Sequence, residues 1–232
     1  MAPELLTIPG LGVPVTVYGA AVALALVLAW ALSLSLARRD RLPTEAVGLV
    51  FVIGALIGLF AARVGYLVQA SLPLDATSLR ALPAGGLAVF PGLFVALPVM
   101  ALACRRWRVP ALAWLDCAAP AIALGGAIER VGAFFAGADF GRYVGPGDFG
   151  HALSVTYPPG SPAYVLHVST LHGLPGVSEA SSAPVHPVQI YLALTCALAG
   201  GLGLWLRGRR RFSGQVLLLV AAVFLLGRAV LF

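Results

Sequence analysis

The sequence predicts an all-α integral membrane protein, a bundle of about six transmembrane helices with a long loop or cap outside the membrane between the fourth and fifth spans. Of the 232 residues, 60% are hydrophobic and only 10% are charged, whereas soluble domains average about 45–50% apolar and about 25% charged residues. A spanning helix needs about 20 apolar residues, so this apolar content is enough for roughly six or seven spans. The composition therefore excludes soluble, disordered, collagen-like and disulfide-stabilised proteins.

Uncharged stretches locate the individual spans. The first helix is expected to begin near Val15, because prolines and glycines interrupt the uncharged stretch before it. The expected spans are residues 15–37, 45–69, 85–104, 111–135, 186–206 and 214–232. Residues 136–185 are rich in Gly, Pro, Ser and His and are too polar to insert, so they form the external loop. We expect residues 1–232 to form a single polytopic membrane domain.

The distribution of arginine predicts the orientation. All 15 basic residues are arginine, and ten of them lie in the loops after spans one, three and five. Basic loops remain on the cytoplasmic side of a membrane. The other two loops contain only Arg80 and Arg142, which acidic residues balance. Both termini and the long loop are therefore expected on the external side. Three cysteines in apolar stretches fit neither a metal site nor a disulfide framework, and we interpret them as core residues.

Three arginines lie inside apolar spans, where an ionisable side chain is costly and usually functional. They are Arg63, Arg130 and Arg228. At about 1.5 Å per residue, they lie roughly 27, 28 and 21 Å from the cytoplasmic ends of their spans. Three cations at one depth would repel one another unless an anion binds between them, and the guanidinium group suits phosphate. A phospholipid headgroup is the natural anion at that depth.

Structural explanations compete with this interpretation. An arginine near the end of a helix can reach the interface without binding a ligand, and Glu129 can neutralise one arginine as a buried ion pair. If this explanation, called snorkelling, has to apply to all three arginines together, it is less economical than an anion bound between them. Tyr18 and Tyr66 can donate hydrogen bonds at the same level, and His186 and Gln189 begin span five there. His186 can titrate near neutrality, or it can serve only as a polar residue before Pro187 at the start of the helix.

Several motifs occur in the order found in one bacterial family. The segment Gly126–Arg142 resembles the signature of the prolipoprotein diacylglyceryl transferase family, a run of arginine, glycine and phenylalanine that ends in Gly-Arg. The other matching pieces are Val17-Tyr18-Gly19, Ala62-Arg63-Val64-Gly65-Tyr66, Leu115-Asp116 with 119–125, His186-Pro187-Val188-Gln189-Ile190-Tyr191, and Gly227-Arg228. The resemblance covers nearly the whole chain.

This resemblance implies transfer of the diacylglyceryl group of phosphatidylglycerol to the lipobox cysteine of a prolipoprotein, without a cofactor. It implies a multi-pass protein of the bacterial inner membrane, in which the arginine distribution then places both termini and loop 136–185 in the periplasm. The partners would be phosphatidylglycerol or another anionic phospholipid and the prolipoprotein signal segment, with no nucleic acid. The resemblance and the arginine pattern together predict Arg130, Arg228 and His186 as catalytic residues, with His186 as base. The expected substrate-binding residues are Arg63, Tyr18, Tyr66, Gln189, Gly132, Asp139, Gly141 and Arg142.

The sequence also departs from the family pattern. Pro91 replaces the histidine that opens the third span in the family, Ala133 replaces an asparagine, and Leu192 replaces a glutamate. Ala138 replaces an acidic residue, for which the adjacent Asp139 is a substitute. These losses leave a second hypothesis open, a catalytically inactive relative that binds phospholipid or lipoprotein as a scaffold or complex subunit. A small-solute transporter is a third hypothesis, although the sequence has no internal repeat or paired broken helices.

Overall fold

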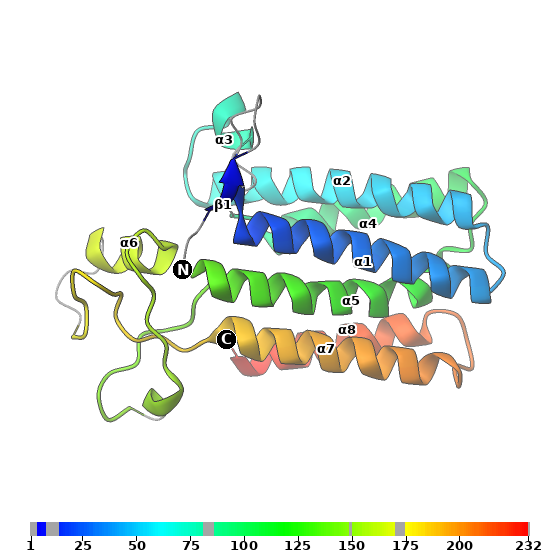
Figure 1. Ribbon diagram of the computed structural model, residues 1–232. Coiled ribbons are helices and arrows are strands. Elements are labelled where there is room, and N and C mark those ends of the chain that lie inside the picture. The colour runs from blue at the N-terminus through cyan, green and yellow to red at the C-terminus, as the bar shows by residue number, and fades with distance from the viewer. Residues whose placement is uncertain (1–3, 8–13, 81–85, 149, 170–174, 232) are drawn as a thin grey trace.

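The protein is a bundle of long helices in a computed structural model that describes residues 4–7, 14–80, 86–148, 150–169 and 175–231. The helices run lengthwise beside one another (Figure 1). Within these described residues, five helices are long and apolar enough to cross a membrane, which confirms the expected multi-pass fold. They are α1 (Val17–Arg39), α2 (Thr44–Gln69), α4 (Val89–Arg106), α5 (Ala111–Ala136) and α7 (Val188–Arg207). The sixth expected span is α8 (Gln215–Leu231), whose 17 residues lie at the short end of the usual range.

The start of α1 differs from the expected position because a strand and a side-chain cap precede it. The Gly19 N–H donates to the Thr16 Oγ1 at 3.0 Å, so the helix begins at Val17 and not near Val15. Strand β2 (Pro14–Thr16) pairs antiparallel with β1 (Glu4–Thr7). The sequence did not predict this hairpin, whose strands are too short to give a clear pattern.

Helix α4 begins at Val89, four residues after the expected start of the third span. Gly86 has a φ of +80°, a conformation that glycine adopts without strain, and the Ala88 N–H donates to the Ala62 carbonyl at 2.9 Å. The chain therefore packs against α2 before it turns into α4. The expected first residue, Gly85, lies outside the described residues. A short helix, α3 (Ala76–Arg80), lies in this connection.

Small residues allow close packing at the helix interfaces, as is usual in membranes. Helix α5 packs on α1 and α7, whereas α2 packs mainly on α4. A Cβ atom at Gly132 would overlap the Cβ of Ala21 on α1, and one at Gly92 would overlap Ala62 on α2. The α1–α5 and α2–α4 pairs thus form separate tight contacts.

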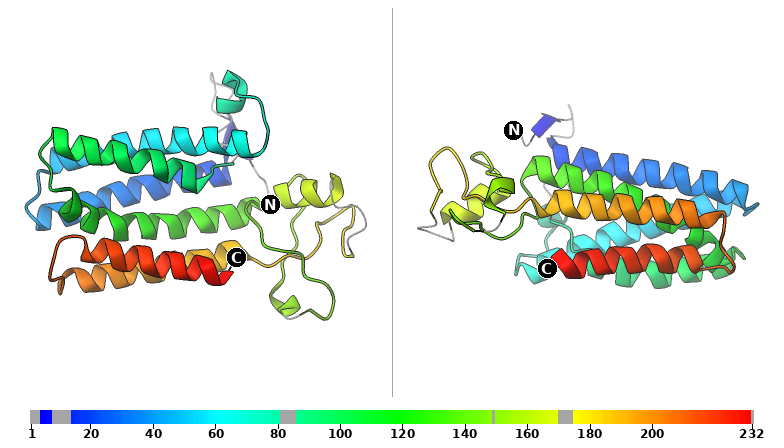
Figure 2. Two further views of the ribbon diagram at one scale, coloured as in Figure 1. Left: turned by 180° about the vertical axis from the view of Figure 1, so that it is seen from behind. Right: turned by 90° about the horizontal axis from the view of Figure 1, so that it is seen from below.

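The polar chain between α5 and α7 lies beyond one end of the bundle, as expected for the external loop. It contains a 3₁₀ turn, η2 (His151–Leu153), and helix α6 (Pro162–Ser169). Tyr157, Ala163 and Val185 form a small buried core within it. Figure 2 shows that α6, β1 and the C-terminal end of α8 all lie at this end, and that the three arginine-rich connections lie at the other.

Candidate active site

Arg130 lies near the C-terminal end of α5 and is held by two carboxylates. Its Nε and Nη2 donate to the two oxygens of Glu129 at 2.6 and 3.1 Å. Its Nη1 donates to Asp139 Oδ2 at 2.8 Å. The Arg130 and Glu129 side chains are 14% and 17% exposed, whereas Asp139 is 55% exposed. The ion pair with Glu129, which the sequence left open as an alternative to ligand binding, is therefore present.

Arg130 and Arg228 meet at one cavity of about 270 Å³, which we call the polar cavity. Arg130 reaches it from α5 and Arg228 from α8, where the Arg228 guanidinium lies over the Phe90 ring at 5.4 Å. The other residues that line it are Gln69, Leu87, Ala88, Val89, Phe90, Pro91, Asp139, Phe140 and Leu192. Two helices far apart in sequence thus bring two cations together.

A second cavity, of about 340 Å³, lies between the α1–α5 and α2–α4 pairs, and we call it the apolar cavity. Its lining includes Val22, Phe51 and Met100, and at one end it reaches Tyr18, Glu129 and Arg130. The Tyr18 hydroxyl interacts with the Glu129 carboxylate. Among the described residues, Arg130 is the charged residue that lines both cavities.

Arg63 is buried but does not lie in either cavity lining. Its Nε and Nη2 donate to the Ser78 carbonyl at 3.0 and 2.7 Å, and its Nη1 donates to the Gly86 carbonyl at 3.1 Å. The Tyr66 ring lies 5.6 Å from its guanidinium and packs against Gly86. Arg63 and Tyr66, both expected to bind substrate, thus hold the α2–α4 connection whose end forms part of the polar cavity wall.

His186, the expected base, is not among the described residues that line either cavity. Its ring packs against Gly150 and lies 6.3 Å from the Tyr191 ring. Its carbonyl accepts from the Gly141 N–H at 3.0 Å, and its own N–H donates to the Arg142 carbonyl at 3.1 Å. The start of α7 therefore joins the loop after α5 through backbone contacts. This placement gives no support to His186 as base.

The remaining expected residues lie outside the lining of the two cavities. Gln189 is fully buried, and its Nε2 donates to the Ala138 carbonyl at 2.7 Å and to the Tyr157 hydroxyl at 3.1 Å. Gly132 packs on α1, Gly141 packs on His186 and Val188, and the Arg142 side chain is exposed. Among the described residues, none of these lines either cavity. The contacts of Gln189 and Gly141 position the loop that carries Asp139.

Sequence reasoning missed Gln69 and Phe140 in the polar cavity. A polar residue at the end of an apolar span, at the same end as the arginines, is the signal that could have found Gln69. Pro91 and Leu192, two of the positions that depart from the family pattern, also line this cavity. The substitutions therefore lie at the site itself.

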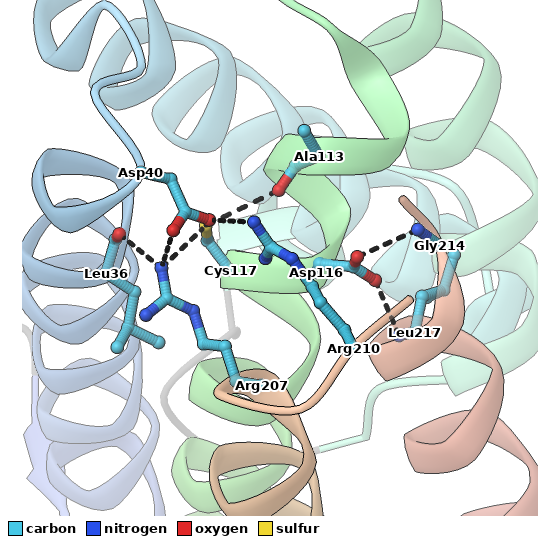
Figure 3. A network of polar contacts seen from close by, with 9 residues as sticks. All are labelled: Leu36, Asp40, Ala113, Asp116, Cys117, Arg207, Arg210, Gly214 and Leu217. Carbon is cyan, nitrogen blue, oxygen red and sulfur yellow. Dashed lines mark hydrogen bonds and ion pairs between the residues drawn. The ribbon is translucent and has the colours of Figure 1, made fainter. Parts of the chain in front are cut away.

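A second charged cluster, at the opposite end of the bundle, joins α1, α5, α7 and α8 (Figure 3). Asp40 binds Arg207 at 2.8 Å and Arg210 at 2.7 Å. Buried Asp116 of α5 accepts from the Gly214 N–H at 2.8 Å and the Leu217 N–H at 3.0 Å, at the start of α8. We call these four charged residues the basal network. Sequence analysis assigned Arg207 and Arg210 of this network only to the orientation of the protein in the membrane. The signal that could have found Asp116 is an aspartate within an apolar span.

A family model described as prolipoprotein diacylglyceryl transferase matches residues 3–231. No curated protein matches the chain. The family match covers every element that contributes to the two cavities, and it agrees with a multi-pass membrane fold. The chain belongs to the prolipoprotein diacylglyceryl transferase family, whose members are membrane transferases that act in lipoprotein maturation.

Proposed function

We propose that the protein transfers the diacylglyceryl group of phosphatidylglycerol to the lipobox cysteine of a prolipoprotein. The observation that carries this proposal is the convergence of Arg130 and Arg228 on a polar cavity that adjoins an apolar one. A phospholipid has the same two parts, an anionic headgroup and apolar chains. The polar cavity suits the phosphate and the incoming thiol, and the apolar cavity suits acyl chains.

The proposed chemistry requires cations where negative charge develops. A bond forms between the cysteine sulfur and a glycerol carbon of the lipid, and the bond from that carbon to the phosphate oxygen breaks. The phosphate leaves as glycerol phosphate and gains one negative charge. Preorganised cations at the position of developing charge lower such a barrier, and guanidinium groups bind phosphate oxygens in pairs. Arg130 and Arg228 are the groups that we assign to this role.

The position of the site supports an external, periplasmic reaction at the bacterial inner membrane. The arginine-rich connections lie at the end of the bundle opposite to α6 (Figure 2). The positive-inside rule therefore orients the polar cavity, β1 and the C-terminal end of α8 toward the outside. A lipobox cysteine that has crossed the membrane behind its signal segment reaches the same side.

A second candidate is a relative that binds phospholipid or a lipoprotein signal segment without turnover. The observation that favours it is the lining of the cavities, where the described residues include no histidine. Pro91 lies in the polar cavity where the resemblance implies a histidine. The two candidates share the arginine site and differ only in chemistry.

Glycerol phosphate release from phosphatidylglycerol micelles with a lipobox peptide tests the proposal. We expect release by the wild-type protein and a loss of about 100-fold in Arg228→Ala, the range found when one group that stabilises a developing anion is removed. Arg105→Ala is the matched control, because Arg105 is exposed at the opposite end of the bundle. No release, together with arginine-dependent lipid binding, would favour the second candidate.

Pro91→His is expected to raise kcat about tenfold at neutral pH, because it places a general base in the polar cavity. Pro91 lies in the first turn of α4, where an added backbone N–H needs no partner within the helix. The rate of glycerol phosphate release is the measurement, with Pro98→Ala, in the middle of α4, as a control for removal of a proline. An unchanged kcat in Pro91→His at neutral pH would contradict the prediction.

A further inference from the structure

The two carboxylates on Arg130 are not equivalent. Glu129 binds through both oxygens and is 17% exposed. Asp139 makes one contact, to Nη1, and is 55% exposed. Asp139 also lies outside α5, after the helix end at Gly137, and its own φ is +51°. Glu129 is therefore a fixed partner of Arg130, whereas Asp139 is held loosely at the cavity surface.

The charges around Arg130 oppose the entry of an anion in this arrangement. One guanidinium faces two carboxylates, so the group already carries one negative charge in excess. Arg228 in the same cavity attracts a phosphodiester, but one that approached Arg130 without displacing a carboxylate would meet two anions there, at a separation where like charges repel. If Asp139 withdraws, its place on Nη1 becomes available, and Arg130 lines the same cavity as Arg228.

The neighbouring contacts allow the side chain to move while the backbone stays in place. Gln189 holds the Ala138 carbonyl at 2.7 Å and is itself bound to Tyr157 at 3.1 Å. Phe140, on the other side of Asp139, also lines the polar cavity. A rotation of the Asp139 side chain away from Arg130 therefore leaves its carboxylate beside the cavity and in contact with water.

We propose that the phospholipid phosphate displaces Asp139 from Arg130 and that the freed carboxylate then accepts the proton of the incoming cysteine thiol. This inference rests on the proposed function. Once Asp139 leaves Arg130, the oxygen that accepted from Nη1 is no longer occupied by the guanidinium and can accept a proton from a neighbouring donor. The chemistry thus becomes available only after the phosphate is bound.

The step balances without another reactant. The thiol proton passes to an oxygen of Asp139, and the sulfur electron pair forms the bond to the glycerol carbon. The electrons of the broken carbon–oxygen bond remain on the phosphate, which Arg130 and Arg228 hold. When glycerol phosphate leaves, Asp139 releases its proton to water and pairs with Arg130 again.

The variant Asp139→Asn tests both proposed roles of Asp139, which are to compete with the phosphate for Arg130 and to accept the thiol proton. The amide carries no charge and accepts no proton. We expect the Kd for phosphatidylglycerol in micelles to fall at least threefold and kcat for glycerol phosphate release to fall at least tenfold. Asp148→Asn is the matched control, since Asp148 lies in the same loop and binds the Gly145 N–H at 2.7 Å. A loosened loop would weaken binding and turnover together, so a higher affinity combined with a lower kcat identifies the exchange.

Each of the other results overturns the inference. An unchanged or weaker affinity of Asp139→Asn for phosphatidylglycerol, with normal binding by the wild type, rules out displacement. A wild-type kcat in Asp139→Asn rules out the proton transfer. Failure of the wild-type protein both to bind phosphatidylglycerol and to release glycerol phosphate would instead remove the proposed function itself, and this result is distinct from the other two.

Discussion

Replacing Arg130 with alanine is expected to reduce diacylglyceryl transfer by about 1,000-fold or more. The loss of one group that stabilises a developing anion costs about 100- to 1,000-fold, and Arg130 has a further role because it neutralises Glu129 and Asp139. Without it, two carboxylates remain at the junction of the cavities and repel the phosphate. Both phosphatidylglycerol affinity and kcat are therefore expected to fall.

Arg130→Lys distinguishes the site from a general need for positive charge. Lysine keeps the charge, but its ammonium group cannot hold both oxygens of Glu129 and a third oxygen in the planar arrangement seen here. We expect a loss of at least tenfold in kcat/KM for the lysine variant, measured as glycerol phosphate release. Arg105→Ala is again the control, and retention of the wild-type rate by Arg130→Lys would contradict the assigned role.

The second large effect is expected at the opposite end of the bundle. Asp40→Asn is expected to lower the free energy of unfolding by about 2–3 kcal/mol, because removal of one partner leaves partly buried charges uncompensated. The affected cations are Arg207 and Arg210, whose side chains are 11% and 23% exposed. Thermal unfolding in detergent measures the change. Glu45→Gln is the control, since Glu45 is exposed at the same end.

The stabilising effect of Asp40 depends on pH in a defined direction. Burial by itself raises the pKa of Asp40, but the hydrogen bond from Arg210 and the charge of Arg207 outweigh it and hold the pKa below its usual value. A carboxylate with a lowered pKa stabilises the fold above its unfolded pKa, about 3.9, and loses this effect as the pH falls through the folded pKa. The difference between wild type and Asp40→Asn should be constant at neutral pH and should shrink below about pH 4. A difference that grows on acidification would contradict this assignment.

The fold was largely predictable because membrane insertion depends on composition over about 20 residues. The spans agree with α1, α2, α4, α5, α7 and α8 to within a few residues. The start of α4 was not predictable, since it depends on the contacts of Gly86 and Ala88 with α2. The β1–β2 hairpin depends on pairing between two segments that no periodicity connects.

The site was predictable in depth but not in direction around each helix. Arg130 and Arg228 line one cavity, whereas Arg63, expected at the same level, binds backbone carbonyls of the α2–α4 connection. His186 lies at the expected end of the bundle, but its ring packs into the α5–α7 loop. Depth follows from counting residues along an apolar span, and direction depends on which helix packs on which. A single sequence therefore specifies the depth of a residue far more clearly than the direction in which its side chain points.

The shared position of Arg130 between the two cavities has a consequence for substrate choice. In the proposed reaction, the bound lipid lies across Arg130, with its acyl chains in the apolar cavity and its headgroup in the polar cavity. Phe51 and Met100 line only the apolar side, and Gln69 and Arg228 line only the polar side. Preference for acyl length and preference for headgroup can therefore change independently in evolution, because substitutions on one side leave the reacting groups on the other side in place.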